Sequence, residues 1–300
     1  MIQVRDSGYD LAVAYRIYPA VSKPALGLPF SEDKYLLSEV CLRSFKESLG
    51  CLRAKIWVLL DGCPPEYEAL FRKYFAREDL NFVRLNSIGN QATFSNQIEI
   101  LLEQQEADFV YFAEDDYFYL PNQFHLMLDF LAANADVDFV SPYDHLDCYT
   151  LDLHHGPKWL KTHGSRHWRT AASTCLTFLT KKETLAKCET VFRSYVRGNN
   201  DCALWLTLTK RRVFNPLAGA RYFLRGQFYW KILVKAWLYG WRQILFGRRL
   251  RLWVPVPGIA THLDSNALSP NIDWRRLMQQ TAEARLEPFM TAERPYSEVS

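Results

Sequence analysis

Runs of apolar residues alternate with amphipathic segments through the first half of the chain. The apolar runs predict strands, and the spacers carry the three-to-four-residue apolar repeat of helices. Strands are predicted at residues 11–17, 55–60, 81–85, 109–112 and 139–140. Helices are predicted at residues 35–49, with Ser31 as N-cap, and at residues 66–77, 93–105 and 122–134. This alternation indicates an α/β fold with a mostly parallel sheet flanked by helices.

The pattern is less regular after residue 140. We expect a long polar loop from about residue 141, which holds His145, His154, His155, His163 and His167. A strand is predicted at residues 173–179, a helix from about residue 182, and a capped helix start at residues 198–201. We divide the chain into a main domain, residues 1–220, and a C-terminal extension of helices and loops, residues 221–300, that packs on it.

The composition fits a folded protein with a large core, because 49% of the residues are hydrophobic and 15% are aromatic. The formal net charge of +3 is too small to attract nucleic acid over a distance, so no nucleic-acid partner is expected. The seven cysteines show no CxxC spacing, and the first residues lack the apolar segment of a signal peptide. A reducing, cytoplasmic location is therefore expected.

Three consecutive carboxylates, Glu114, Asp115 and Asp116, follow a predicted strand. Ligands of open α/β sheets bind beyond the carboxyl ends of the strands, so Arg16 and Asp61, at two other strand ends, should share the same rim. Adjacent carboxylates repel each other and need water or a cation as a partner. Their oxygens suit Mg²⁺ or Mn²⁺, which are often shared with substrate phosphates. A solvated acidic loop is the alternative interpretation.

The ordered series of features resembles the GT-A glycosyltransferases, in particular those similar to family 2. The sequence FAEDD looks like their acidic metal-binding motif, with EDD in place of DxD. The resemblance implies a Rossmann-like, nucleotide-sugar-binding catalytic domain of the hexosyltransferase type. It also implies transfer from a nucleotide-sugar donor to a saccharide or lipid-linked acceptor, with Mn²⁺ or Mg²⁺ on the diphosphate. The resemblance covers about residues 10–215, with one further point near His262.

The resemblance also assigns roles to single residues. Asp116 is the expected direct metal ligand, and His262 is expected as a late histidine ligand. Glu114 is also expected at the metal site, behind the direct ligands. The residues expected to bind the donor are Arg16, Asp61, Asn90, Asn96 and Asp115. Asp201 looks like the catalytic base of inverting members, although its site reads Asn-Asp rather than Glu-Asp. A helix N-cap is the alternative role for Asp201.

Two other functions stay open. A sugar-nucleotidyltransferase also pairs such a sheet with carboxylates and Mg²⁺, but it would want a glycine-rich phosphate loop after the first strand, and residues 15–19 contain no glycine. A non-catalytic adaptor would bind a membrane or nucleic acid through residues 228–253. There, Lys231, Lys235 and Arg242 share one helical stripe opposite a tryptophan-rich face. This pattern fits either a helix lying in the inner face of a membrane or a core helix.

Overall fold

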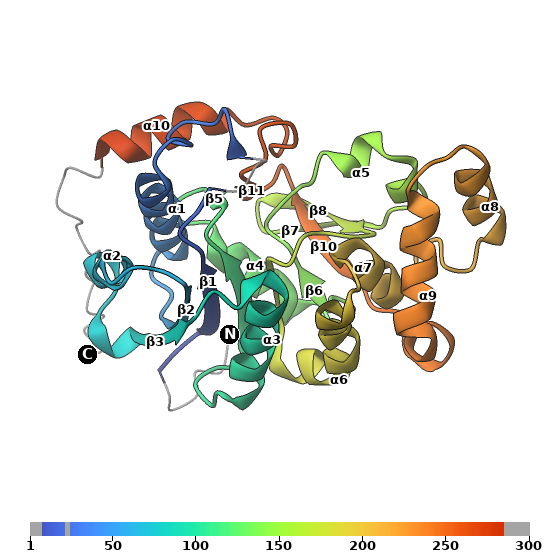
Figure 1. The fold of residues 1–300 in the computed structure, drawn as a ribbon, viewed down its shortest axis with the longest axis horizontal. Coiled ribbons are helices and arrows are strands. Elements are labelled where there is room, and N and C mark those ends of the chain that lie inside the picture. The colour runs from blue at the N-terminus through green and yellow to red at the C-terminus, as the bar shows by residue number, and fades with distance from the viewer. Residues whose placement is uncertain (1–7, 22–24, 285–300) are drawn as a thin grey trace.

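The computed structural model describes residues 8–21 and 25–284 (Figure 1). Within this part of the chain, a nine-stranded sheet has the order β3-β2-β1-β4-β9-β6-β10-β8-β7. In it, β9 and β8 run opposite to the other strands. The fold is therefore mixed α/β with a mostly parallel sheet, as predicted. The prediction about a signal peptide concerns residues 1–7, and the predicted extension ends with residues 285–300; both stretches lie outside the described residues.

The strands fall into three groups. A parallel block is formed by β1 (Leu11–Ile17), β2 (Ala54–Asp61), β3 (Leu80–Leu85) and β4 (Phe109–Glu114). The rest of the large sheet is β6 (Phe139–Val140), β7 (Leu160–His163), β8 (Arg166–Ala171), β9 (Phe178–Lys181) and β10 (Leu252–Val256). A small separate sheet pairs β5 (Tyr117–Tyr119) with β11 (Ala260–His262).

Helices cover both faces of the large sheet. One face carries α1 (Lys34–Leu49), α2 (Glu66–Tyr74) and α4 (Phe124–Ala133), and the other carries α3 (Gly89–Glu103), α6 (Lys182–Phe192) and α7 (Asp201–Thr209). The remaining α-helices of the described residues are α5 (Asp147–Thr150), α8 (Pro216–Leu224), α9 (Tyr229–Phe246) and α10 (Trp274–Ala284), and three short 3-10 helices lie at residues 77–79, 152–154 and 193–197. Figure 1 places α8 and α9 together at one end of the molecule.

The central strand β1 explains why its sequence is apolar without interruption. Leu11, Val13 and Tyr15 pack into the core under α1, α2 and α4, whereas Ala12 and Ala14 pack into the core under α3, α6 and α7. Successive side chains of a strand point to opposite faces, and here both faces are covered. The strand is buried along its whole length and was predicted to the residue.

Two helix starts differ from the prediction because other side chains cap them. Helix α1 begins at Lys34, and the Asp33 carboxylate accepts the Leu36 N–H at 3.0 Å, so the assignment of Ser31 as N-cap was wrong. Helix α3 begins at Gly89 rather than at residue 93, because a carboxylate from β2 binds its first N–H groups. Helix α2 ends at Tyr74 rather than at residue 77.

The second half departs further from the prediction. The expected polar loop after residue 140 contains α5 and the hairpin of β7 and β8, in which β7 forms a polar edge of the sheet. The strand predicted at residues 173–179 begins only at Phe178. Residues 228–253 are divided between α9 and β10, so Trp253 lies in the middle of the sheet and not on a helix. The boundary proposed at residue 220 falls inside α8.

The contact between α7 and α9 depends on Gly240. A Cβ atom there would lie 2.6 Å from Thr207 Oγ1 and closer still to its methyl group. Gly240→Ala should therefore lower the free energy of unfolding by about 1–3 kcal/mol in urea melts. Gly219→Ala, in α8, is the matched control, because its Cβ would meet Leu233 at an ordinary 3.7 Å and should cost nothing. Equal melts for the two variants would contradict this packing.

Candidate functional site

A cavity of about 440 Å³ opens where β1, β2 and β4 end. The carboxyl ends of parallel strands meet at one edge of a sheet, and this is where α/β proteins bind ligands. The cavity brings together most of the residues singled out in the sequence: Arg16, Asp61, Asn90, Glu114, Asp115 and Asp116. Arg16 and Glu114 are direct neighbours in the register of β1 and β4.

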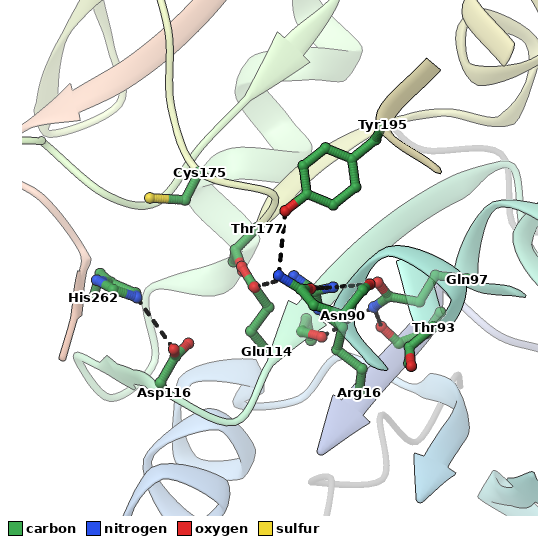
Figure 2. A network of polar contacts seen from close by, with 12 residues as sticks. Arg16, Asn90, Thr93, Gln97, Glu114, Asp116, Cys175, Thr177, Tyr195 and His262 are labelled. Atoms are coloured by element: carbon green, nitrogen blue, oxygen red, sulfur yellow. Dashed lines mark hydrogen bonds and ion pairs between the residues drawn. The ribbon is translucent and has the colours of Figure 1, made fainter. Parts of the chain in front are cut away.

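The Arg16 guanidinium is the centre of a polar network (Figure 2). It forms an ion pair with Glu114 and donates a hydrogen bond of 3.0 Å to the carbonyl of Asn90. Thr177 donates to the second oxygen of Glu114 at 2.7 Å. The Asn90 amide in turn donates to the Tyr195 hydroxyl at 3.2 Å. Both oxygens of Glu114 thus have partners within the protein, and Glu114 holds Arg16 at the cavity that both residues line.

Asp61 lines the cavity, but its carboxylate is hydrogen-bonded to the first turn of α3. Its carboxylate accepts the N–H groups of Ile88 and Gly89 at 2.7 and 2.9 Å and the Thr93 hydroxyl at 3.4 Å. These bonds satisfy backbone donors that a helix start leaves without partners. Asp61 therefore fixes the first turn of α3, and this turn carries Asn90 to the rim of the cavity.

Asn96 is the one proposed donor-binding residue that the structure keeps apart from the others. It lies half-buried on α3, and it is not among the described residues that line the cavity. Its neighbour Gln97, which the sequence did not single out, is fully buried instead. The Gln97 amide donates to the carbonyls of Ala14 and Ala113 at 2.7 and 3.1 Å, which ties α3 to β1 and β4.

Asp116 and His262 form a second pair of interacting charged side chains at the site. The pairing of β11 with β5 sets His262 opposite Tyr117, and Figure 2 shows its ring directed at Asp116. The distance from His262 Nε2 to Asp116 Oδ2 is 3.1 Å, across 146 positions of sequence. Burial opposes charge on both groups, yet the mutual attraction lowers the pKa of Asp116 to about 2 and raises the pKa of His262 to about 9.

Asp115 has its own counterion. The Lys34 ammonium at the start of α1 lies 2.5 Å from its carboxylate, and the Tyr18 N–H donates to it at 3.4 Å. Burial raises the pKa of Asp115 while Lys34 opposes this shift. The three adjacent carboxylates are therefore tolerated because each faces a different cation of the protein: arginine, lysine or histidine.

The site offers a divalent ion part of a coordination shell. Among the described residues, no three His, Cys, Asp or Glu side chains converge closely enough to hold a metal. Asp116 and His262 nevertheless offer an oxygen and a nitrogen side by side, and Asp116 Oδ1 is buried with no hydrogen-bond partner in this part of the chain. Such a donor pair suits Mn²⁺ better than Mg²⁺, which prefers oxygen. The fit is that of a two-ligand site, in which substrate oxygens and water complete the shell.

Asp201 occupies the first turn of α7, and the helix cap is Asn200. The Asn200 side chain accepts the Ala203 N–H at 2.7 Å, whereas the Asp201 carboxylate accepts the N–H of the adjacent Cys202. The alternative role of Asp201 as the N-cap was therefore wrong. Burial raises the pKa of Asp201, and the nearby Glu114 charge adds to the shift. A carboxylate with a raised pKa is better suited to accept a proton.

Three residues of the site were not predicted from the sequence: Lys34, Thr177 and Tyr195. Each reaches the cavity or its network from an element far along the chain from its partner. Lys34 carries a weak local signal, since it stands at a helix start near the first strand. We find no sequence pattern that marks Thr177 or Tyr195.

Comparison with known proteins gave likenesses of shape only. No protein family matches the chain, and no curated protein does. The glycosyltransferase GlyE of Streptococcus pneumoniae TIGR4 resembles it with a TM-score of 0.43 and 13% identity, over 91% of this chain and 60% of that one. A putative nucleotide-diphospho-sugar transferase of Desulfovibrio desulfuricans G20 has a TM-score of 0.43 and 13% identity, over 68% of this chain and 76% of that one. A cytidylyltransferase of Leptospira borgpetersenii has a TM-score of 0.34 and 11% identity, over 61% of this chain and 63% of that one.

The chain thus spans about three fifths of the length of the GlyE chain that it resembles. At these identities and scores the likeness carries no information about the reaction. What this chain does has to be argued from its own residues.

Proposed function

We propose that this protein is a metal-dependent glycosyltransferase of the GT-A type. It transfers a sugar from a nucleotide-sugar donor to a saccharide or lipid-linked acceptor. The observation that carries the proposal is that Arg16 and Asp116 line one cavity at the carboxyl ends of parallel strands, with His262 against Asp116 at its edge. This is the crevice in which doubly wound sheets bind nucleotides, and its charged groups match a diphosphate and a divalent ion.

The donor is held through its phosphates and its nucleoside. Arg16 and Lys34 line the cavity, and they supply positive charge toward the diphosphate. Asn90 and Asp115 offer polar groups to the ribose or the sugar, and Asp61 keeps the first turn of α3 in place beside them. Asn96 is left out of this proposal because it lies off the cavity.

Asp116 and His262 are the proposed protein ligands of Mn²⁺ or Mg²⁺. The ion would act as a Lewis acid that stabilises the charge developing on the leaving diphosphate. The partnerless Asp116 Oδ1 and the adjacent imidazole support this assignment. Glu114 is assigned to holding Arg16, since both of its oxygens have partners within the protein.

Asp201 is the proposed general base, which makes the reaction inverting. Its carboxylate accepts the proton of the acceptor hydroxyl while that oxygen forms a bond to the anomeric carbon of the donor sugar. The bond from this carbon to the diphosphate breaks on the opposite face, and the nucleoside diphosphate leaves with the electron pair. The raised pKa of Asp201 supports this role.

We place the enzyme in the cytoplasm, in contact with the inner face of a membrane. All seven cysteines lie within the described residues and are free thiols, as expected of a reducing compartment.

The products formed from activated sugars test the function. The full chain is incubated with Mn²⁺ and a panel of nucleotide sugars, and separately with nucleoside triphosphates and sugar 1-phosphates. Release of a nucleoside diphosphate is the expected result. Release of pyrophosphate in the second set would instead establish a sugar-nucleotidyltransferase. No turnover in either set would contradict both and favour a non-catalytic adaptor.

A further inference from the structure

Helices α8 and α9 expose an unusual number of large apolar side chains. Together with Phe214 and Phe228, which precede them, they contribute ten of the eighteen exposed large hydrophobic residues among those described. Leu217, Leu224 and Phe246 are exposed to 81%, 83% and 79%. The others are Phe214, Phe223, Phe228, Val234, Leu238, Trp241 and Leu245. We call these ten residues the apolar face; a cluster of this kind marks a surface that binds something.

The two sides of α9 differ in burial. Ile232, Ala236 and Gly240 are buried against neighbouring helices, as in a core helix. Trp237 is half-buried, and its ring N–H donates to the Val213 carbonyl at 2.9 Å. Trp241, one turn further on, is 45% exposed. One side of α9 is therefore buried like that of a core helix, and the other side is exposed.

An open groove of about 980 Å³ runs between α8 and α9 within the apolar face. Phe223 contacts Trp230 across it, with ring centres 5.4 Å apart, and Phe214 contacts Trp237 at 6.0 Å. Its lining is almost entirely apolar. Transfer of such a surface from water into an apolar medium is favourable in free energy.

The charge of this region is entirely positive. Between Asp201 and Asp264 the sequence holds eleven Lys and Arg residues and no Asp or Glu. Arg212, Arg248 and Arg251 pair with carboxylates elsewhere. Five exposed cations have no carboxylate partner in the part of the chain that the structure describes: Arg221, Arg225, Lys231, Arg242 and Arg249. Arg249 donates to the Thr209 carbonyl at 2.9 Å, and we call the other four the free cations.

The free cations lie beside the apolar face rather than apart from it. Lys231 lies 5.7 Å from the ring centres of Phe228 and Trp230, and Arg242 lies 5.3 Å from that of Trp241. On a helix, positions 230, 234, 238, 241 and 245 form one stripe, and positions 231, 235 and 242 form the next. An apolar stripe bordered by cations and aromatic rings is the arrangement of helices that lie in a membrane interface.

We infer that the apolar face docks on an anionic membrane surface. Its leucines and aromatic rings would enter the boundary of the acyl chains, and the flanking cations would meet lipid phosphates. A nucleic acid would use the cations but gain nothing from the exposed leucines. A second copy of the chain would bring like charges together across the contact. In the described part of the chain, no helix has the length and apolar character needed to cross a bilayer.

Docking would also bring the proposed base toward the membrane. Lys235 donates to the Gly198 carbonyl at 2.7 Å, and the Tyr239 hydroxyl donates to the Arg197 carbonyl at 2.7 Å. Both carbonyls belong to the segment that leads into Asp201. Of the two proposed acceptor classes, this favours the lipid-linked one. The inference rests on the membrane contact proposed above, but it does not need sugar transfer.

Vesicle co-sedimentation of the full chain tests the inference. We expect binding to vesicles of phosphatidylcholine with phosphatidylglycerol, weaker binding at high ionic strength, and little binding to phosphatidylcholine alone. The double variant Leu217→Ser, Leu224→Ser should lower the partition coefficient by at least about tenfold, with an unchanged melt because both side chains are exposed. Leu160→Ser is the matched control, since Leu160 is 75% exposed on β7.

The cations are tested in the same way. Arg221→Gln with Arg225→Gln should weaken binding to anionic vesicles, whereas Arg72→Gln with Arg84→Gln, which changes two cations on α2 and β3, should not.

Several results would overturn the inference. These are no vesicle binding by the wild type, binding that both α8 variants retain, and a loss that Leu160→Ser reproduces. Nucleic-acid binding without vesicle binding, or a dimer that the leucine changes dissociate, would assign the face to another partner. Asp116→Ala should bind vesicles like the wild type, and the leucine variant should bind nucleotides like the wild type. Failure of the docking inference is therefore distinguishable from failure of the proposed sugar transfer.

Discussion

Asp116→Ala is expected to abolish metal-dependent binding of nucleotide sugars and to lower transfer by more than about 10²-fold. Asp116 is one of the two proposed protein ligands, and its Oδ1 atom has no other partner among the described residues. The variant should still fold, because the His262 imidazole can release its proton once the carboxylate is gone. Calorimetry with Mn²⁺ and nucleoside diphosphates measures the binding, and circular dichroism checks the fold.

Asp152→Ala is the matched control for this substitution. It also removes a carboxylate that faces a histidine, since Asp152 lies 3.8 Å from His155, but it does so outside the cavity. Donor binding should be unchanged in this variant. Metal-dependent affinity that survives in Asp116→Ala would end the assignment of Asp116 as a ligand.

Asp201→Asn is expected to reduce transfer by about 10²- to 10⁴-fold while donor binding and stability stay near those of the wild type. The substitution removes the basic carboxylate but leaves the cap of α7 intact, because Asn200 provides it. Single-turnover transfer assays and thermal melts measure the two quantities. Asn200→Ala is the counterpart: it should cost about 1 kcal/mol of stability through the lost cap and change the rate far less.

The pH profile separates the base from a merely structural residue. Since burial raises the pKa of Asp201 above its usual 3.8, kcat/KM should rise with pH through a pKa higher than that of an ordinary Asp. This limb should disappear in Asp201→Asn. Transfer near the wild-type rate in Asp201→Asn would leave Asp201 as a helix residue and would reopen a retaining mechanism.

The parallel half of the sheet was predictable because its sequence pattern is local. β1 is buried on both faces, so its side chains read as one apolar run, and the predicted and observed bounds agree. β7 and β8 were missed for the opposite reason. Leu160–His163 is a polar edge strand that owes its conformation to pairing with β8, and such pairing leaves no periodic signal in the sequence. β10 was missed because the prediction treats residues 228–253 as one helical segment, whereas residues 247–251 separate α9 from β10.

The location of the site at the strand ends was predictable from the sequence, but the contacts between its side chains were not. Strand ends mark Arg16, Asp61 and Asp116, because the topology of an α/β sheet brings these ends together. Lys34 and Thr177 could not be predicted, since each meets its carboxylate through tertiary contacts alone. The roles within the cluster likewise depend on three dimensions: Glu114 is held by Arg16 and Thr177, which leaves Asp116 as the residue that faces His262.

Calorimetric titration of the wild-type chain with a panel of nucleotide sugars tests the central claim, that the cavity at the ends of β1, β2 and β4 binds a nucleotide sugar through a divalent ion. The titrations are run with Mn²⁺ and again with excess chelator. We predict at least one donor that binds with Mn²⁺, is lost on chelation, and is lost in Asp116→Ala but not in Asp152→Ala. A panel without any binder, or binding that depends on neither Mn²⁺ nor Asp116, would contradict the account.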